Sequence, residues 1–204
     1  TYTVNAVNPS NGFTGNTTVT VTIDPASNTL AAVAGGPQIC QNISISPTGT
    51  SYRDGNCNLI ATIIPSGASP VSNAINTCID LDNGATKRGT STLYLARKYD
   101  IEPLLDPATS TADIKLYYLQ SEFNNYNLKA ADSGHKPLPT GPADATGISK
   151  LVLRQFHGTG TNPANYTGAS QDFTTAVSGF TVLWNATYSW WEVTVPVTGF
   201  SGFY

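Results

Sequence analysis

Residues 184–204 read WNATYSWWEVTVPVTGFSGFY and contain all three tryptophans of the chain. From Trp191 onward, large apolar side chains stand at every second position: Trp191, Val193, Val195 and Val197. Successive side chains of a β-strand point to opposite faces, so this alternation predicts a strand with one buried face. The stretch holds no set of residues typical of a catalytic or metal site. It favours the core of a β-sandwich in a structural module.

Composition limits the classes of protein to which the chain can belong. Its 204 residues suffice for one large all-β domain, or for one domain and a fragment. Charged residues make up 11%, about half the usual share, and the net charge is -3. The absence of a Lys/Arg cluster argues against nucleic-acid binding. No apolar run in the sequence is long enough for a transmembrane helix.

From about Cys40 onward, short apolar runs alternate with segments rich in Gly, Pro, Asn and Ser. These runs lie at residues 59–64, 93–101, 112–119, 151–156 and 180–184. Many short strands separated by turns predict an all-β protein, an immunoglobulin-like antiparallel β-sandwich. One short helix is expected at residues 121–127, with Ser121 as its N-cap. The Pro- and Gly-containing stretch 130–147 is expected to be a long loop.

The N-terminal part predicts a separate β-hairpin. Residues 2–7 and 17–23 alternate in polarity, and turn-forming residues lie between them. A lone two-stranded hairpin is only marginally stable in water. We therefore interpret residues 1–39 as the terminal strands of a preceding immunoglobulin-like repeat plus a linker, and residues 40–204 as the β-sandwich module.

Arg97 is expected to point into the core, because it stands in phase with Tyr99 along one apolar run. An unpaired buried guanidinium is very costly, so it requires a carboxylate or carbonyl partner. The sequence does not rank the candidate partners, which are Glu122, Asp113 and Asp80.

Three cysteines, Cys40, Cys57 and Cys78, lack the paired C-x-x-C spacing of a zinc site. One disulfide and one remaining thiol are expected. A Cys57–Cys78 bond is favoured because each residue adjoins a strand-like run, and Cys40–Cys57 is the main alternative. A third alternative, in which all three cysteines are buried free thiols, also remains open. Either disulfide implies an oxidising compartment.

Two further groups are weak candidates for binding. Asp80, Asp82 and Asn83 alternate oxygen ligands before a glycine, as calcium loops do, but a plain turn is the favoured alternative. Tyr188 and Trp190 flank a predicted turn and could stack on a glycan or a partner. Edge packing is the favoured alternative for this pair.

Catalysis finds little support in the sequence, and we expect a non-enzymatic protein without a cofactor. His135 and His157 are the only histidines, and no G-x-S-x-G motif accompanies them. The spacing of the three glutamates gives no reason to bring two of them together in a glycosidase site: Glu102, Glu122 and Glu192.

Several segments beyond Cys40 follow one another in a characteristic order. They are 57–61 (CNLIA), 64–72 (IPSGASPVS), the strand-like run at Cys78, 97–103 (RKYDIEP), 116–118 (LYY) with 122–123 (EF), 138–140 (LPT), 155–158 (QFHG) and 191–203 (WEVTVPVTGFSGF). Together they resemble the large β-sandwich module near the C-terminus of secreted and cell-surface proteins of Bacteroidota. Such proteins are exported by the type IX secretion system.

This resemblance implies a location outside the cell and a place in a multidomain protein, after immunoglobulin-like or cadherin-like repeats. It also supports the Cys57–Cys78 pairing. The implied function is that of a structural or adhesive module. Its partners would be neighbouring modules, the secretion machinery, surface glycans or like subunits. The alternative is an accessory or carbohydrate-binding domain of a secreted multidomain enzyme.

Overall fold

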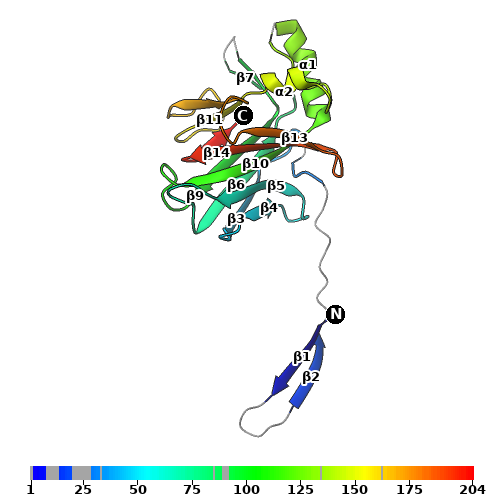
Figure 1. The fold of residues 1–204 in the computed structure, drawn as a ribbon, viewed down its shortest axis with the longest axis vertical. Helices are drawn as coiled ribbons and strands as arrows, with labels where there is room; N and C mark the ends of the chain where they lie inside the picture. Colours follow the sequence, from blue (N-terminus) through cyan, green and yellow to red (C-terminus); the bar gives the residue numbers. More distant parts are fainter. Residues whose placement is uncertain are drawn as a thin grey trace.

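The structure is a computed structural model. It describes residues 2–7, 14–19, 29–32, 34–84, 86–88, 92–133, 135–161 and 163–204. Two antiparallel sheets pack against each other, and two helices lie together at one end of them (Figure 1). The predicted all-β sandwich is therefore confirmed.

Each layer of the sandwich follows a fixed strand order. The five-stranded sheet runs β13 (Thr181–Asn185), β14 (Trp190–Thr198), β10 (Thr111–Leu119), β5 (Leu59–Pro65) and β4 (Thr50–Arg53). The six-stranded sheet runs β12 (Ser170–Phe173), β11 (Leu153–Phe156), β15 (Ser201–Phe203), β9 (Arg97–Pro103), β6 (Ala74–Leu81) and β3 (Ile39–Ser44). The short strands β7 (Thr86–Arg88) and β8 (Thr92–Tyr94) pair with each other.

Strand β14 carries the alternation that the sequence predicted. Trp191, Val193 and Val195 are fully buried, and Val197 is 4% exposed. β14 pairs with β10 along its whole length, from Leu119 opposite Trp190 to Thr111 opposite Thr198. The inward face of this pair forms the centre of the core between the two sheets.

The helical part of the chain is longer than expected. Helix α1 (Gln120–Ser133) begins one residue before Ser121, which is exposed and does not cap it. Instead, the Leu119 backbone N–H donates to Oε2 of Glu122 over 2.9 Å. One face of α1 is buried at positions i, i+3 and i+7. The polar residues between these positions make the helical spacing hard to recognise in the sequence. The buried residues are Phe123, Tyr126 and Ala130.

A second helix, α2 (Ala145–Lys150), starts within the stretch that was expected to be one long loop. Asp144 caps it by accepting a hydrogen bond of 2.8 Å from the Gly147 backbone N–H. This capping hydrogen bond satisfies one of the backbone donors left open at a helix start. The expected loop at 130–147 therefore contains the end of α1 and the start of α2.

The sandwich includes residues that were expected to belong to the linker. Leu30 is 7% exposed and Ala31 is fully buried. The Leu59 N–H donates to the Thr29 carbonyl over 2.9 Å, and the Ala31 N–H donates to the Leu59 carbonyl over 2.8 Å. The expected boundary at residue 39 is thus too late, because residues 29–31 already pack on the sandwich.

The expected hairpin at the N-terminus is present. Strand β1 (Tyr2–Val7) pairs with β2 (Thr14–Val19), so the second strand lies earlier than the expected 17–23. Residues 20–23 fall outside the described part of the chain. The origin of this hairpin in a preceding immunoglobulin-like repeat stays a prediction.

The disulfide joins Cys40 to Cys78, and both expected pairings that involve Cys57 are wrong. Strand β3 was not recognised in the sequence, and its register places Cys40 opposite Cys78 on β6, with 4.0 Å between their Cα atoms. Cys57 is free and lies in the turn between β4 and β5, which belong to the other sheet. Closing the chain between residues 40 and 78 stabilises the fold by about 4 kcal/mol in the chain-entropy model.

Candidate functional site

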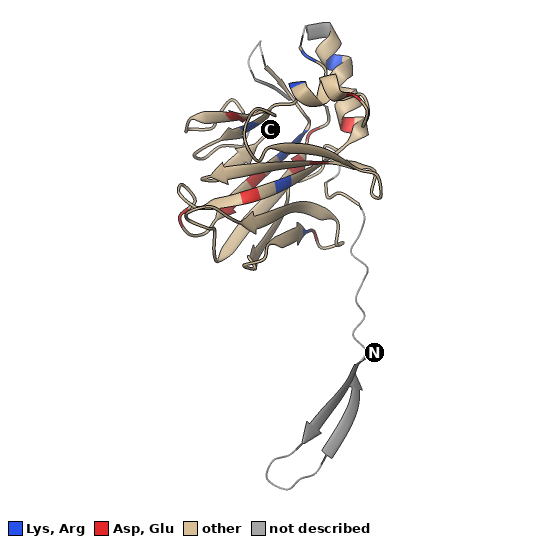
Figure 2. Cartoon of the chain, viewed as in Figure 1, with Lys and Arg blue, Asp and Glu red and all other residues tan. Residues whose placement is uncertain are grey.

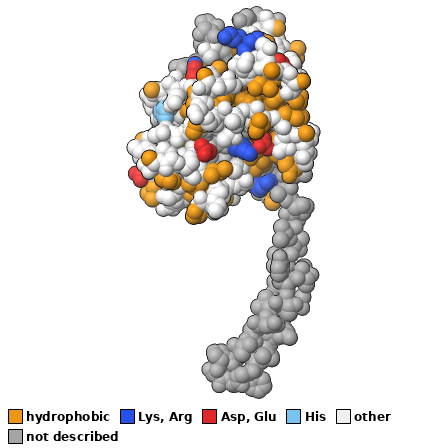
Figure 3. All heavy atoms as spheres, viewed as in Figure 1, with side chains coloured by type: hydrophobic (Ala, Val, Ile, Leu, Met, Phe, Trp, Pro, Cys, Tyr) orange, Lys and Arg blue, Asp and Glu red, His pale blue; other side chains and the backbone are white. Residues whose placement is uncertain are grey.

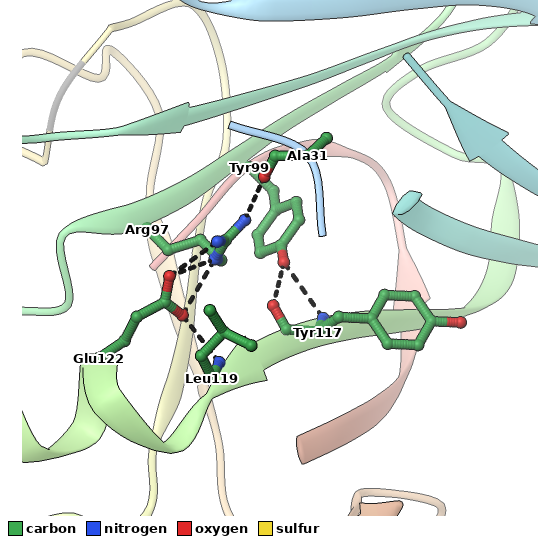
Figure 4. Close-up of polar contacts among 6 residues, drawn as sticks. All are labelled: Ala31, Arg97, Tyr99, Tyr117, Leu119 and Glu122. Carbon is green, nitrogen blue, oxygen red and sulfur yellow. Dashed lines mark hydrogen bonds and ion pairs between the residues drawn. The ribbon is translucent and has the colours of Figure 1, made fainter. Parts of the chain in front are cut away.

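A buried ion pair connects the two sheets with α1 (Figure 4). Arg97 on β9 is 1% exposed, and its Nη2 lies 2.7 Å from Oε1 of Glu122. Its Nε also donates to this oxygen over 2.8 Å, and its Nη1 donates to the Ala31 carbonyl over 2.8 Å. The expected inward orientation of Arg97 is confirmed, and Glu122 is its partner. Asp80, another candidate, pairs with Lys98 instead.

Two tyrosines complete this cluster. The Tyr99 hydroxyl accepts a hydrogen bond of 3.1 Å from the Tyr117 N–H and donates one to the Tyr117 carbonyl. Burial raises the pKa of Tyr99, so its hydroxyl keeps the proton that it donates. The cluster therefore ties β9, β10, α1 and residue 31 together.

A pocket of about 450 Å³ opens beside this cluster, between α1, β8 and β11. We call it the α1 pocket. Its buried lining consists of leucine and aromatic side chains: Leu93, Tyr94, Tyr118, Phe123, Tyr126, Leu151, Leu153 and Tyr204. Pockets of this size and apolar character are the usual small-molecule sites of proteins.

Tyr118 lines this pocket, and its hydroxyl is buried in the wall behind it. Its ring meets Tyr99 edge-on at 5.8 Å and Phe123 at 5.9 Å. Its hydroxyl is buried without a hydrogen-bond partner among the described residues. Burial raises the pKa of Tyr118 well above its ordinary value, so the hydroxyl remains a donor. Leaving such a group unsatisfied costs about 1–3 kcal/mol.

The mouth of the α1 pocket is charged. Lys136, Lys150, Val152 and Asp172 are its exposed lining residues. Half-buried Arg154 also lines it and pairs with Asp172 through two hydrogen bonds of 2.5 and 2.6 Å. Figure 3 shows Lys and Arg side chains near the end of the molecule that carries the helices. Elsewhere in the described part of the chain, positive and negative residues are interspersed (Figure 2).

A second cavity, of about 400 Å³, is lined by acidic and tyrosine side chains. The Nζ of Lys98 lies 2.9 Å from Oδ2 of Asp80 and 3.7 Å from Oδ1 of Asp82, so an ammonium already compensates both carboxylates. Asn83 is exposed, and the Gly84 N–H closes a tight turn on the Asp82 carbonyl over 2.8 Å. Within the described ranges, no three His, Cys, Asp or Glu residues are grouped to hold a metal. The calcium expectation gains no support here.

Asp100 gives this second cavity a dependence on pH. Burial, with a contribution from the Glu102 carboxylate, raises the pKa of Asp100 to about 6, against an ordinary value of about 3.9. Folding therefore favours the protonated form. Ionised Asp100 therefore lowers the free energy of unfolding. This loss of stability is absent below about pH 4, grows from pH 4 to pH 6, and is complete above about pH 6.

Asp100→Asn is accordingly expected to raise the free energy of unfolding at pH 7.5 by about 1–2 kcal/mol, after allowance for partial exposure. At pH 3.5 the variant should match the wild type. Urea unfolding of the full chain at both pH values measures this difference. Asp106→Asn, at an exposed carboxylate, controls for the loss of a charge. An equal gain at both pH values would contradict the prediction.

The candidate stacking surface of Trp190 and Tyr188 is not open at Trp190, which is only 4% exposed. Tyr117 from β10 meets Trp190 edge-on at 5.5 Å, and Tyr188 lies across it at 4.8 Å. The Trp190 indole N–H donates to Oε1 of Glu192 over 3.3 Å. Edge packing, the favoured alternative, therefore describes Trp190. Tyr188 alone remains exposed, at 41%.

The two histidines lie apart in the chain, His135 between α1 and α2 and His157 after β11. His135 lines the α1 pocket, and His157 directly follows β11. The His157 backbone N–H donates to the Ala169 carbonyl over 3.0 Å, which holds the chain beyond the strand. Neither imidazole forms an ion pair within the part of the chain that the structure describes.

Sequence reasoning missed the α1 pocket. Residues 135–138 were expected to lie in the loop 130–147, and residues 151–152 were expected to start a strand. The only indication of the pocket in the sequence was the helical spacing of the buried apolar residues of α1, which the polar residues between them obscure. No model of a known protein family matches the chain, and no curated protein or solved structure matches it either. None of the described helices has the length and apolarity needed to cross a membrane.

Proposed function

We propose that the chain is a non-catalytic structural or adhesive module of a large exported cell-surface protein, carried by the type IX secretion system. The observation that supports this proposal most directly is the Cys40–Cys78 disulfide. Disulfides persist in oxidising compartments and are rare in reducing ones. The resemblance of segments beyond Cys40 to the modules of such proteins supplies the rest of the argument.

The architecture suits a mechanical role. The core between the sheets is continuous, and the disulfide joins edge strand β3 to its neighbour β6. A cross-link at this edge resists peeling of strand β3 from the sheet. Exposed apolar side chains could meet neighbouring modules or like subunits. They include Leu104, Leu105 and Leu183, which are 58%, 50% and 61% exposed.

Export and thiol state test this proposal together. In the source bacterium, an antibody against the module is expected to detect it in the surface or extracellular fraction. Thiol labelling of that fraction should modify Cys57 alone before reduction, and all three cysteines afterwards. A strain without a working type IX export channel should retain the protein inside the cell. A cytoplasmic protein with three reactive thiols in the wild type would contradict the proposal.

A further inference from the structure

We propose that the α1 pocket binds a small apolar monocarboxylate, with the hydrocarbon body in the pocket and the carboxylate at the mouth. This binding site goes beyond the proposed structural role and does not rest on it. A module can carry such a site whether or not it is exported.

The interior selects an apolar body. The volume of about 450 Å³ falls within the range of about 300–1,000 Å³ typical of small-molecule sites. Leucines on β8 and around the start of β11 face aromatic rings from β10 and α1, and these include Leu93, Leu153, Tyr118 and Phe123. Transfer of a hydrocarbon chain from water onto this lining is favourable in proportion to the area buried.

The mouth selects a negative charge. Lys136, Lys150 and Arg154 face it together with one carboxylate, that of Asp172. Asp172 compensates Arg154, and Asp144, outside the lining, interacts with Lys150, so Lys136 and part of the Lys150 charge remain as the local positive excess. The chain as a whole has a net charge of -3, so this local excess is opposite in sign to the average surface. A carboxylate is attracted to such a mouth, and a quaternary ammonium is repelled.

The inner end of the α1 pocket, at Tyr118, decides the orientation of the ligand. Next to Tyr118, the charges of Arg97 and Glu122 pair with each other at 2.7 Å, so no uncompensated cation is available there. The lysines at the mouth are exposed and can meet a carboxylate that keeps part of its hydration. The tail therefore points inward and the carboxylate outward. The structure shows no partner for the Tyr118 hydroxyl, and this orientation does not supply one.

Three ligands with one tail and different charges test the selectivity of the full chain by isothermal titration at low salt. Octanoate is expected to bind about tenfold more tightly than octanol, and octyltrimethylammonium more weakly than either. Raising the salt concentration should narrow the gap between octanoate and octanol, because exposed charges are screened. Octanol affinity equal to that of octanoate, or no octanoate binding at millimolar concentration, would overturn the proposal.

Four variants locate the site. The double variant Lys136→Ala/Lys150→Ala should lower the affinity for octanoate about tenfold and leave the affinity for octanol unchanged. The control Lys129→Ala, on α1 outside the pocket, should change neither affinity. Val152→Trp adds bulk at an exposed mouth position, 46% exposed in the wild type, and should weaken both ligands. Unchanged binding in this variant would place the site elsewhere. Tyr118→Phe should change the affinity for octanoate by less than twofold. A large loss of octanoate affinity in this variant would contradict the inward orientation of the tail.

Discussion

Glu122→Ala is expected to lower the free energy of unfolding by about 3–5 kcal/mol, because it leaves the Arg97 guanidinium buried without its carboxylate. Arg97 is 1% exposed, and in the variant it keeps the hydrogen bond of 2.8 Å from its Nη1 to the Ala31 carbonyl. The variant also removes the acceptor of the Leu119 N–H at the start of α1. Urea unfolding of the full chain at pH 7 measures the loss.

Two comparisons separate the buried pair from ordinary surface charge. Asp172→Ala breaks a pair in which Arg154 and Asp172 are 28% and 42% exposed, and it should cost less than about 1 kcal/mol. Arg97→Leu/Glu122→Leu removes both charges, and its cost should be smaller than the sum of the two single leucine variants. Additive losses in that cycle would show that Arg97 and Glu122 are not energetically coupled. Equal losses for Glu122→Ala and Asp172→Ala would show that burial does not raise the cost of breaking the pair.

The sequence predicted those parts of the fold that depend on local alternation. β14, β10 and β9 each bury one face for most of their length, so their period of two is visible in the residues. Arg97 could be placed inward for the same reason. Its partner could not be chosen, because Glu122 reaches it from a helix whose position depends on packing.

The features that were not predicted from the sequence lie where the alternation of apolar residues is weak, or where the contacting segments are far apart in the sequence. Strand β3 lies at a sheet edge and half-buries only alternate residues, so its six residues gave no clear signal and the Cys40–Cys78 pairing was not foreseen. Trp190 stands out of phase with the core, yet Tyr117 from β10 covers it on the outer face. The α1 pocket combines segments that are far apart in the sequence, and alternation within any one of them does not reveal it.

Trp191 joins the five-stranded sheet to α1, and this connection gives the second large prediction. The side chain is fully buried. Its ring stacks on Phe123 at 5.7 Å and meets Trp184 edge-on at 5.3 Å, and its indole N–H donates to Oε1 of Gln120 over 2.9 Å. Because Phe123 also lines the α1 pocket, the packing of Trp191 supports both the core and the pocket wall.

Trp191→Ala is therefore expected to lower the free energy of unfolding by about 3–5 kcal/mol, the usual range for a large aromatic residue removed from a core. Because the cavity forms directly beneath α1, amide hydrogen exchange in α1 should accelerate more than exchange in β6 and β9 of the opposite sheet. Trp191→Phe keeps a ring against Phe123 and loses the bond to Gln120, so its cost should be much smaller. Uniform acceleration of exchange across both sheets and α1 would mean that Trp191 stabilises the sandwich as a whole, without a particular connection to the helix.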